Sequence, residues 1–384
     1  MREFVDRDAV VELTRALVAV DTQNPPGNER PAADVARQAL EPFGARFEEV
    51  EPEPGRTSLL ATIGTGDGSR PTLLVNGHLD VVPVDAARWA HDPFRAELDD
   101  GRLYGRGTSD MKGGVAAAVE ALSALHRAGR QPACDLAFHL VADEERGGRL
   151  GTAALVERGV LRADACLVPE PTGLAVCVAE RGLLTATITV RGRPAHGGQP
   201  GDGVSAIEMA AKVVLALHDA DFGDPDHPLL GRPTCNVGVI QGGTGHNTVA
   251  ESCTLVVDRR LLPGTSREAA EAGLRERIDA IDEPDLRYQL EPGVYGEASE
   301  LDPGHPFVDE VQAAMAAAVG RPAPVIGMTF STDARFVRNQ AGIPAVVCGP
   351  GDLSQAHTND EWVVVDKLVD AAAVYAHLYA SFGG

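Results

Sequence analysis

Three acidic side chains follow directly after an apolar run in this sequence. Residues 136–142 (LAFHLVA) are typical of a buried strand, and Asp143, Glu144 and Glu145 come next. The simplest interpretation is an exposed turn, because charged residues are common where a strand leaves a sheet. Two adjacent carboxylates also suit two different tasks, since one can bind a metal ion while its neighbour accepts a proton from bound water. The choice depends on which other residues reach the same place.

Ionisable residues also follow other apolar runs. His78 and Asp80 follow TLLVNG and Glu170 follows CLVP, whereas Asp110 lies in GRGTSD and His357 in SQAHTND. Each has an ordinary alternative role as a hydrogen-bonding loop residue. Imidazole and carboxylate without thiolates are the ligands of a catalytic zinc or similar divalent ion, not of a closed structural site. The candidates exceed the need of one zinc ion and favour two metals that share a bridging carboxylate.

The elements that must position these groups alternate between strand and helix. Residues 71–80 (PTLLVNGHLD), 135–143 (DLAFHLVAD) and 163–171 (ADACLVPEP) are typical of buried strands, and residues 111–129 of a helix rich in small side chains. Buried strands alternating with helices indicate a doubly wound α/β sheet. Ligands bind outside the carboxyl ends of the strands in such sheets, so the topology would bring the ionisable groups to one edge.

The pattern changes from about Gly182. A strand with polar and apolar residues in alternation is followed by a helix, two strands, a second helix and a closing strand; the ranges are 183–192, 203–220, 233–243, 252–264, 267–281 and 286–293. This order predicts a ferredoxin-like α+β unit. The first pattern returns after Pro303. We therefore expect one domain made of residues 1–180 and 294–384, with residues 181–293 inserted as a second domain.

Composition excludes several classes of protein. The 384 residues exceed the roughly 250–300 at which a single core stops growing, so two domains are expected. The net charge of -22 argues against binding to nucleic acid or an anionic membrane, because phosphate contacts need clustered Lys and Arg. No apolar run approaches the roughly 18 residues of a membrane span. The six cysteines form no C-x-x-C pair, so we expect reduced, buried thiols in a cytoplasmic protein.

Over nearly its whole length the chain resembles the co-catalytic di-zinc amidohydrolases, which include acetylornithine deacetylase, succinyl-diaminopimelate desuccinylase, aminoacylase-1 and glutamate carboxypeptidase. The matching motifs, in order, are NGHLDVVP, GRGTSDMKGG, ADEERGG, VPEPT, RGRPAHGGQP, GGTGHN, VVDRRLLPG, STDAR and QAHTNDE. The resemblance implies a zinc-exopeptidase-like catalytic domain with a doubly wound mixed sheet, and an inserted ferredoxin-like α+β domain that serves as a dimerisation domain or lid.

The resemblance also implies a ligand set. His78 and Glu170 would bind one divalent ion, Glu145 and His357 the other, and Asp110 would bridge them. Zn²⁺ is the expected metal, with Co²⁺ or Mn²⁺ as substitutes.

Two further acids and one peptide bond belong to the same motifs. The resemblance implies that Asp80 holds an imidazole in its tautomer and that Glu144 is the general base. The bond from Asp110 to Met111 is expected to be cis.

The inserted domain would contribute to the reaction as well. By resemblance, His196 reaches across a dimer interface and polarises the scissile carbonyl of the neighbouring subunit, and Asn247 acts beside it. Arginine suits the binding of a substrate carboxylate because its planar fork meets the carboxylate at two points. The resemblance, through the family's usual D-x-R spacing, favours Arg260 for this task, with Arg259 as the alternative. The groups that would hold the substrate are Arg181, Asn247, Arg260, Ser331, Thr332 and Arg335.

The implied reaction is hydrolysis of the amide bond in an N-acylated amino acid, as in a deacetylase or desuccinylase. A dipeptidase or carboxypeptidase that releases a C-terminal amino acid is the alternative, because it uses the same bond, metals and carboxylate clamp. A catalytically silent metal-binding or scaffold protein is an alternative of another class, and the presence of Glu144 and of every ligand argues against it. The expected partners are the small-molecule substrate and a second copy of the chain in a homodimer.

Overall fold

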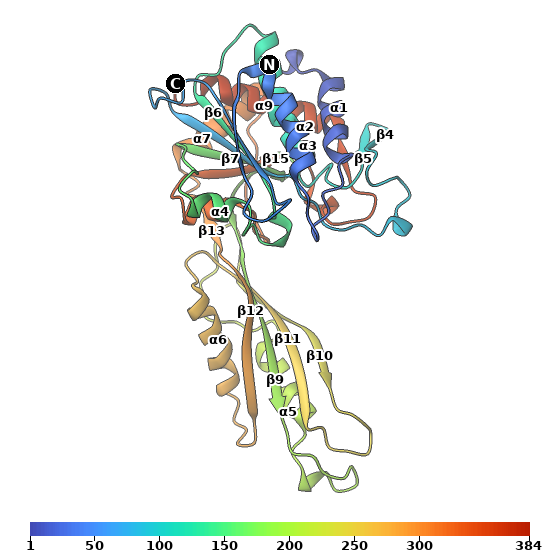
Figure 1. Ribbon diagram of the computed structural model, residues 1–384. Helices are drawn as coiled ribbons and strands as arrows, with labels where there is room; N and C mark the ends of the chain where they lie inside the picture. Colours follow the sequence, from blue (N-terminus) through green and yellow to red (C-terminus); the bar gives the residue numbers. More distant parts are fainter. The chain divides into compact units, whose positions relative to one another are not determined.

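The computed structural model describes residues 1–384 and divides them into two compact units (Figure 1). The first, called the α/β unit, contains Met1–Val178, Leu301–Ile326 and Thr332–Gly384. The second, called the inserted unit, contains Ala179–Glu300 and Gly327–Ser331. The chain thus leaves the first unit and returns to it. The domain borders expected from the sequence, at residues 181 and 293, stay a prediction.

A nine-stranded mixed sheet forms the centre of the α/β fold, and this agrees with the expected fold class. The order along the sheet is β1 (Arg46–Val50), β2 (Ser58–Ile63), β6 (Asp135–Val141), β3 (Thr72–His78), β7 (Ala165–Pro171), β15 (Ala345–Gly349), β8 (Val176–Glu180) and β13 (Ser299–Glu300), with β14 (Val325–Met328) paired to β8. The four central strands β6, β3, β7 and β15 run parallel. The outer pairs are antiparallel. All four central strands therefore end at the same edge.

Helices and short elements complete the α/β unit. The helices are α1 (Arg7–Val18), α2 (Arg30–Leu40), α3 (Lys112–Arg127), α4 (Thr152–Glu157), α7 (Pro306–Val319), α8 (Ala334–Asn339) and α9 (Val365–Ser381). A small antiparallel sheet contains β4 (Glu97–Asp99), β5 (Arg102–Tyr104) and β16 (Trp362–Val364). The 3₁₀ helices are η1 (Arg2–Phe4), η2 (Glu41–Phe43), η3 (Ala86–Arg88), η4 (Glu144–Arg146) and η6 (Leu353–Gln355).

The small residues of α3 let the helix lie very close to the strands. A Cβ atom on Gly113 would come within 2.2 Å of the carbonyl oxygen of Thr108, and one on Gly114 within 2.2 Å of that of Pro169. A side chain at either position would therefore push α3 away from the β7 end. On the other side α3 packs against α9, where the Tyr379 hydroxyl donates to the Ala118 carbonyl at 3.1 Å.

The inserted unit has the element order that the sequence predicts. Its antiparallel sheet runs β10 (Thr234–Gly242), β11 (Ser252–Leu261), β9 (Gly182–Arg191) and β12 (Arg287–Gly296). Two helices, α5 (Ala206–Leu217) and α6 (Arg267–Asp279), accompany the sheet, and η5 (Pro200–Asp202) lies in a loop. The order β-α-β-β-α-β with β9 and β11 in the centre is the ferredoxin-like arrangement.

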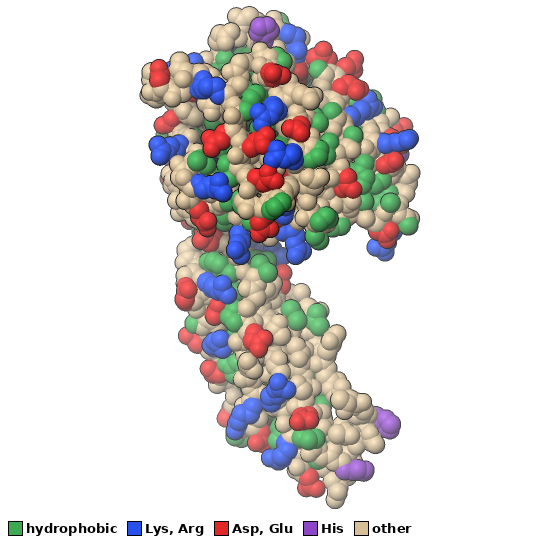
Figure 2. All heavy atoms as spheres, in the orientation of Figure 1, with side chains coloured by type: hydrophobic (Ala, Val, Ile, Leu, Met, Phe, Trp, Pro, Cys, Tyr) green, Lys and Arg blue, Asp and Glu red, His purple; other side chains and the backbone are tan.

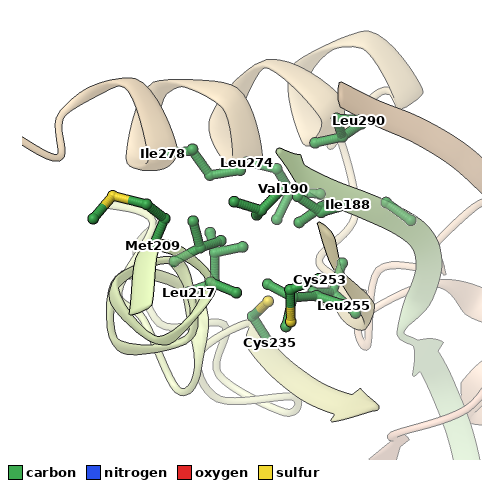
Figure 3. Close-up of a cluster of buried hydrophobic side chains, with 14 of the residues drawn as sticks. Ile188, Val190, Met209, Leu217, Cys235, Cys253, Leu255, Leu274, Ile278 and Leu290 are labelled. Carbon is green, nitrogen blue, oxygen red and sulfur yellow. The ribbon is translucent and has the colours of Figure 1, made fainter. Parts of the chain in front are cut away.

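The core of the inserted unit is apolar and lies on one face of its sheet (Figure 3). Along β9, Leu184, Ala186, Ile188 and Val190 are buried, whereas the residues between them are half-buried. This period of two places one set of side chains against the helices and the other set on the open face. Each buried aliphatic side chain contributes roughly 1.5–3 kcal/mol relative to exposure.

The surface carries charges of both signs. On the face in Figure 2, acidic and basic side chains are mixed over the α/β unit. None of the helices is both long enough and apolar enough for a membrane span.

Candidate metal centre

The predicted ligands stand where the parallel strands of the α/β unit end. His78 is the last residue of β3, Glu170 lies one residue before the end of β7, and Glu145 is in η4 directly after β6. Asp110 precedes α3, and His357 follows β15 in a loop. Because β6, β3, β7 and β15 are neighbours in the sheet, five residues from distant parts of the chain converge at one edge.

His78, Asp110 and Glu170 form the first group of donor atoms. The Nε2 atom of His78 lies 3.1 Å from Oδ1 of Asp110 and 3.5 Å from Oε1 of Glu170. The ring of His78 is fully buried, and its Nδ1 lies 2.8 Å from the backbone carbonyl oxygen of Asp80. Since that carbonyl can only accept, Nδ1 carries a proton, and Nε2 is the ring atom that would bind a metal ion.

Asp110, Glu145 and His357 form the second group. The Nε2 atom of His357 lies 2.9 Å from Oε2 of Glu145 and 3.5 Å from Oδ2 of Asp110. In each group the donor atoms lie within 4.8 Å of one another, as the ligands of one metal ion do. Asp110 offers Oδ1 to the first group and Oδ2 to the second, so its geometry suits a bridging carboxylate.

The neighbouring side chains do not supply enough positive charge to balance the acids of this centre. Burial raises the pKa of Glu170 well above its usual range, and the neighbouring Asp110 adds to the effect. Burial and Asp110 also raise the pKa of Glu145 against the opposing influence of His357. Burial alone would lower the pKa of His78, but Glu170 and Asp110 outweigh it and the pKa is raised well above its usual value. Two divalent cations would supply the charge, so the donor set fits the metals that the sequence predicts.

Glu144 is half-buried beside this centre. Burial raises the pKa of its carboxyl group well above the usual range, and Asp333 and Glu145 add to the effect against the opposing influence of His78. The backbone amides of Glu144 and Glu145 donate to the carboxylate of Asp80 at 3.1 and 3.2 Å. Asp80 therefore acts on His78 through its backbone oxygen and on the acidic turn through its side chain.

The expected cis peptide bond between Asp110 and Met111 is confirmed. The residues before this bond are held by Glu361, an acid of the QAHTNDE motif outside the predicted ligand set. Its carboxylate is fully buried and accepts from Arg106 at 2.7 Å and from the amides of Gly107, Ser109 and Asp110 at 3.0, 2.8 and 3.0 Å. The signal in the sequence was an acid four residues after a candidate ligand, but that spacing alone does not reveal the loop it binds.

In the inserted unit, the structure brings His196 and Asn247 together. His196 forms an isolated bridge with Thr248, and the amide of Gly197 donates to the Asn247 carbonyl at 2.8 Å. Both side chains are exposed. The amide of Gly198 donates to Nδ1 of His196 at 3.1 Å, so Nδ1 accepts and Nε2 carries the proton. His196 thus has an N–H group available for an oxygen acceptor.

The arginines of β11 point to opposite faces of the inserted sheet. Arg259 is buried, lies 3.7 Å above the ring of Phe222 and donates to the Ala270 carbonyl at 2.5 Å. Arg260 is half-buried on the other face and forms two hydrogen bonds with Asp258, at 2.9 and 3.1 Å. This geometry supports the preference for Arg260 as the residue that faces a ligand.

Arg181 lies near Arg260 in the inserted unit. Burial lowers the pKa of Arg181, and the positive charge of Arg260 adds to the effect. Arg181 also donates to the carbonyls of Leu230 and, at 2.8 Å, Arg232. Two guanidinium groups that disfavour each other's charge are suited to an anion.

The three remaining candidates belong to the STDAR motif. Ser331 is half-buried in the inserted unit, and Thr332 is buried in the α/β unit. Arg335 is also buried; it donates to the carbonyl of Thr332 at 3.0 Å and to that of Gly147 at 2.9 Å. Arg335 thereby supports the turn that carries Glu144, and its contact with a substrate carboxylate stays a prediction.

Comparisons with known proteins identify the family of this chain. Residues 74–381 match the family described as Peptidase family M20/M25/M40. Acetylornithine deacetylase of Vibrio campbellii is 31% identical over 335 residues, which cover 85% of this chain and 84% of the relative. Acetylornithine deacetylase of Vibrio atlanticus is 30% identical over 364 residues, which cover 92% of each protein.

Solved structures show the same fold. Aminopeptidase PepT from Bacillus cereus matches with a TM-score of 0.82 at 23% identity, and the match covers 98% of this chain and 99% of the aminopeptidase chain. Human carnosine dipeptidase 1 matches with a TM-score of 0.77 at 17% identity, and the match covers 99% of this chain and 97% of the dipeptidase chain. At these identities the likeness shows the fold alone. With the sequence match over residues 74–381, the chain belongs to the Peptidase family M20/M25/M40 and is a metallohydrolase of the metallopeptidase and amidohydrolase class.

Proposed function

We propose that this enzyme hydrolyses the amide bond of an N-acylated amino acid and releases a carboxylic acid and the amino acid. The observation that carries the proposal is the pair of donor groups that share Asp110, with the carboxyl group of Glu144 beside them. The acetylornithine deacetylases among the relatives favour an N-acyl amino acid as the substrate.

Two Zn²⁺ ions would occupy the centre, with Co²⁺ or Mn²⁺ as substitutes. His78 and Glu170 would hold one ion, Glu145 and His357 the other, and Asp110 both. When bound, such a pair lowers the pKa of a shared water molecule and polarises the carbonyl of the amide.

Glu144 carries the proton in this mechanism. Its carboxylate accepts a proton from the water as the water oxygen bonds to the amide carbon, and it later donates that proton to the nitrogen of the leaving amine. A carboxyl group with a raised pKa suits both steps, because it holds the proton long enough to deliver it. The C–N bond breaks when the amine takes the proton.

The inserted unit supplies most of the other polar groups. His196 donates its Nε2–H to the oxygen that becomes negative during the attack, and Asn247 acts beside it. The groups proposed to hold the substrate carboxylate are Arg181, Arg260, Ser331, Thr332 and Arg335.

The inserted unit also forms a homodimer in this proposal. Strand β10 is an edge of its sheet and exposes Val239 and Ile240, and the side chain of Leu215 on α5 is 84% exposed. An unpaired strand edge next to exposed apolar side chains is a surface that a second copy of the chain can cover. Residues 181–293 would then serve as the dimerisation domain and lid. The cytoplasm is the proposed location, since all six cysteines are buried as expected of reduced thiols.

The test compares two neighbouring carboxylates. Glu144→Gln is expected to keep two equivalents of zinc while kcat falls roughly 10³-fold or more, because only proton transfer is lost. Glu145→Gln makes the same chemical change one residue later, and zinc content is expected to fall. Metal analysis and hydrolysis of N-acetyl, N-succinyl and N-formyl amino acids beside dipeptides measure both effects. A fully active Glu144→Gln enzyme would contradict the mechanism.

The same panel separates the alternatives. Preference for dipeptides would make the enzyme a dipeptidase or carboxypeptidase, and zinc binding without release of any product would support a silent binding protein. Subunit sharing is tested by mixing the His196→Ala and Glu144→Ala variants under conditions of subunit exchange. Recovered activity in the hybrid is expected, whereas exchange without recovery would refute the role of His196 across the dimer.

A further inference from the structure

Asp143 is the one acid of the triplet without a role in the proposed mechanism. It is buried, and its backbone is left-handed with φ of 70°. The Oδ2 atom of Asp143 accepts from the amide of Leu150 at 3.0 Å, and its carbonyl oxygen accepts from the amides of Arg146 and Gly148 at 3.2 and 2.7 Å. Asp143 therefore closes the turn of residues 143–150 that presents Glu144 and Glu145.

The other oxygen of Asp143 faces a buried arginine. Nη1 of Arg56 lies 3.1 Å from Oδ1 of Asp143. The opposite side of the guanidinium group is fixed by Glu29, which is fully buried and accepts from Nε at 3.1 and 3.0 Å and from Nη2 at 2.6 Å. Arg56 is thus held rigidly by one acid and directed toward another.

The chain folds tightly around this guanidinium group. A Cβ atom on Gly27 would come within 2.5 Å of Cζ of Arg56, and the φ of Gly27 is +80°. Only glycine suits this backbone conformation and this space. Residues 24–29 (NPPGNE) therefore enclose the guanidinium group of Arg56. The proposed mechanism gives this segment no role.

Asn24 forms hydrogen bonds with Asp80 and Asp143, the two acids that hold the turn of residues 143–150. Its Nδ2 donates to Oδ2 of Asp80 at 2.8 Å and to Oδ1 of Asp143 at 3.2 Å, so both amide hydrogens are used. Asp80 in turn accepts from the backbone amides of Glu144 and Glu145. The turn is therefore fixed through Asp143 at its start and through Asp80 at its next two residues.

Charge makes Arg56 the critical member of this network. Glu29, Asp80 and Asp143 are three buried acids, and Arg56 is the basic residue that contacts two of them. Removing one partner of a buried ion pair leaves an uncompensated charge, and the surrounding backbone moves to relieve it. Here the backbone that would move is the turn that carries the proposed base.

We infer that Arg56, held by Glu29, is a positioning residue that sets the geometry of the Glu144–Glu145 turn through Asp143. Arg56 belongs neither to the two groups of metal donor atoms nor to the residues proposed to hold the substrate. This inference rests on the proposed function for the role of Glu144, but the geometry of the turn can be measured without any turnover.

The experiment uses the full-length protein with Arg56→Met, Asp143→Asn and the double variant. Arg127→Met is the matched control, since it removes an arginine from another buried glutamate, Glu120, in the same unit. Zinc content, Tm, kcat and KM are measured for each, together with the visible absorption spectrum of the Co²⁺-loaded protein. That spectrum responds to the arrangement of the ligands, including Glu145.

For Arg56→Met we expect a fall in kcat of roughly 10²-fold with nearly unchanged KM, because a displacement of the base of about 1 Å has that effect. The Co²⁺ spectrum should change. The double variant should be no slower than the slower of the two single variants, because Arg56 acts on the turn through Asp143. Arg127→Met should lower Tm and leave kcat and the spectrum as in the wild type.

The inference is overturned if Arg56→Met lowers Tm but keeps the wild-type kcat and Co²⁺ spectrum, as a merely structural residue would. If Arg56→Met does not fold, Arg56→Lys takes its place, since it keeps the charge but loses the fork that binds two acids; the same two readouts then decide. Should the wild type hydrolyse no amide in the panel, the proposed function fails, and the spectrum alone still decides the positioning role.

Discussion

The two units of this protein bury different kinds of side chain. The α/β unit buries a set of ionisable groups around one edge of its sheet, including His78, Asp110 and Glu361. The core of the inserted unit consists of apolar side chains, and its candidate residues His196 and Asn247 are exposed. Buried charges are costly unless each has a partner, so the α/β unit must supply hydrogen bonds and counter-charges at this edge. The inserted unit buries few charged groups, Arg259 among them, and presents His196 and Asn247 at its surface.

This difference teaches which properties each unit controls. Metal binding and proton transfer depend on groups held at fixed distances, and these belong to the α/β unit. The inserted unit is stabilised like an ordinary small domain, by aliphatic packing beneath an open sheet face. Changes in the two units should therefore affect different measurements.

The largest expected effect is that of metal removal. Treatment with a chelator should reduce hydrolysis to background, and added Zn²⁺ should restore it. Without cations the cluster of acids lacks its counter-charge, so hydrogen exchange should accelerate in residues 143–150 and stay unchanged in β9 and β11. Hydrogen exchange followed by mass spectrometry checks this. Equal acceleration in both units would remove the proposed division of roles.

The next effect concerns the exposed histidine. His196→Ala should lower kcat by roughly 10²–10³-fold, the usual result of losing one donor to a developing oxyanion. Its zinc content should equal that of the wild type, because the ligands lie in the α/β unit. His246→Ala is the control, since His246 is also exposed in the adjacent loop and has no proposed role. Similar losses in both variants would indicate damage to the loops instead of catalysis.

A smaller effect is expected from acid. Burial lowers the pKa of His139 in β6 to about 4. As the pH falls below about 6.5, the unfolded chain binds a proton at this residue while the folded protein stays neutral until about pH 4. The contribution to stability is therefore complete above about pH 6.5 and is lost between 6.5 and 4, by up to roughly 3 kcal/mol.

Urea unfolding at pH 7.5 and 5 measures the effect of His139. His139→Leu should lose less stability than the wild type on this change of pH, because its side chain cannot bind a proton. Identical losses in both proteins would show that His139 does not contribute.

The smallest effect on folding is expected at the proposed dimer surface. Leu215→Lys should change the free energy of unfolding by less than about 0.5 kcal/mol, because an exposed side chain packs against little within its own chain. It should nevertheless shift the protein toward monomers in sedimentation experiments at micromolar concentration. Leu98→Lys, at an exposed leucine of the α/β unit, is the control. If Leu98→Lys dissociated the dimer and Leu215→Lys did not, the interface would lie on the α/β unit and the proposed dimer surface would be contradicted.

The sequence was most informative about features that depend on residues close together in the chain. Three ligands lie at or near the ends of apolar strands, so His78, Glu145 and Glu170 could be placed at the sheet edge from the order of elements alone. The alternation along β9 likewise predicted a sheet with one covered face. These features depend on neighbours in the chain, and they recur in the structure.

The residues that support the site were not predictable in the same way. Glu361 binds a loop about 250 positions earlier in the chain. Arg56 and Asp143 likewise come from segments that are far apart in the sequence. Such pairs depend on how loops fold over one another, and no periodicity records that. The preference for Arg260 over Arg259 stays a prediction, and its structural support is the packing of Arg259 against Phe222.

The two histidines of the metal centre differ in their access to solvent. His78 is fully buried, whereas the side chain of His357 is 56% exposed and reaches the centre from a surface loop. An ion held on the His357 side would exchange with the medium faster than its neighbour. A chelator should therefore strip the centre in two kinetic phases, and protein loaded with zinc and then exposed to cobalt should become heterometallic, with the newcomer on the His357 side.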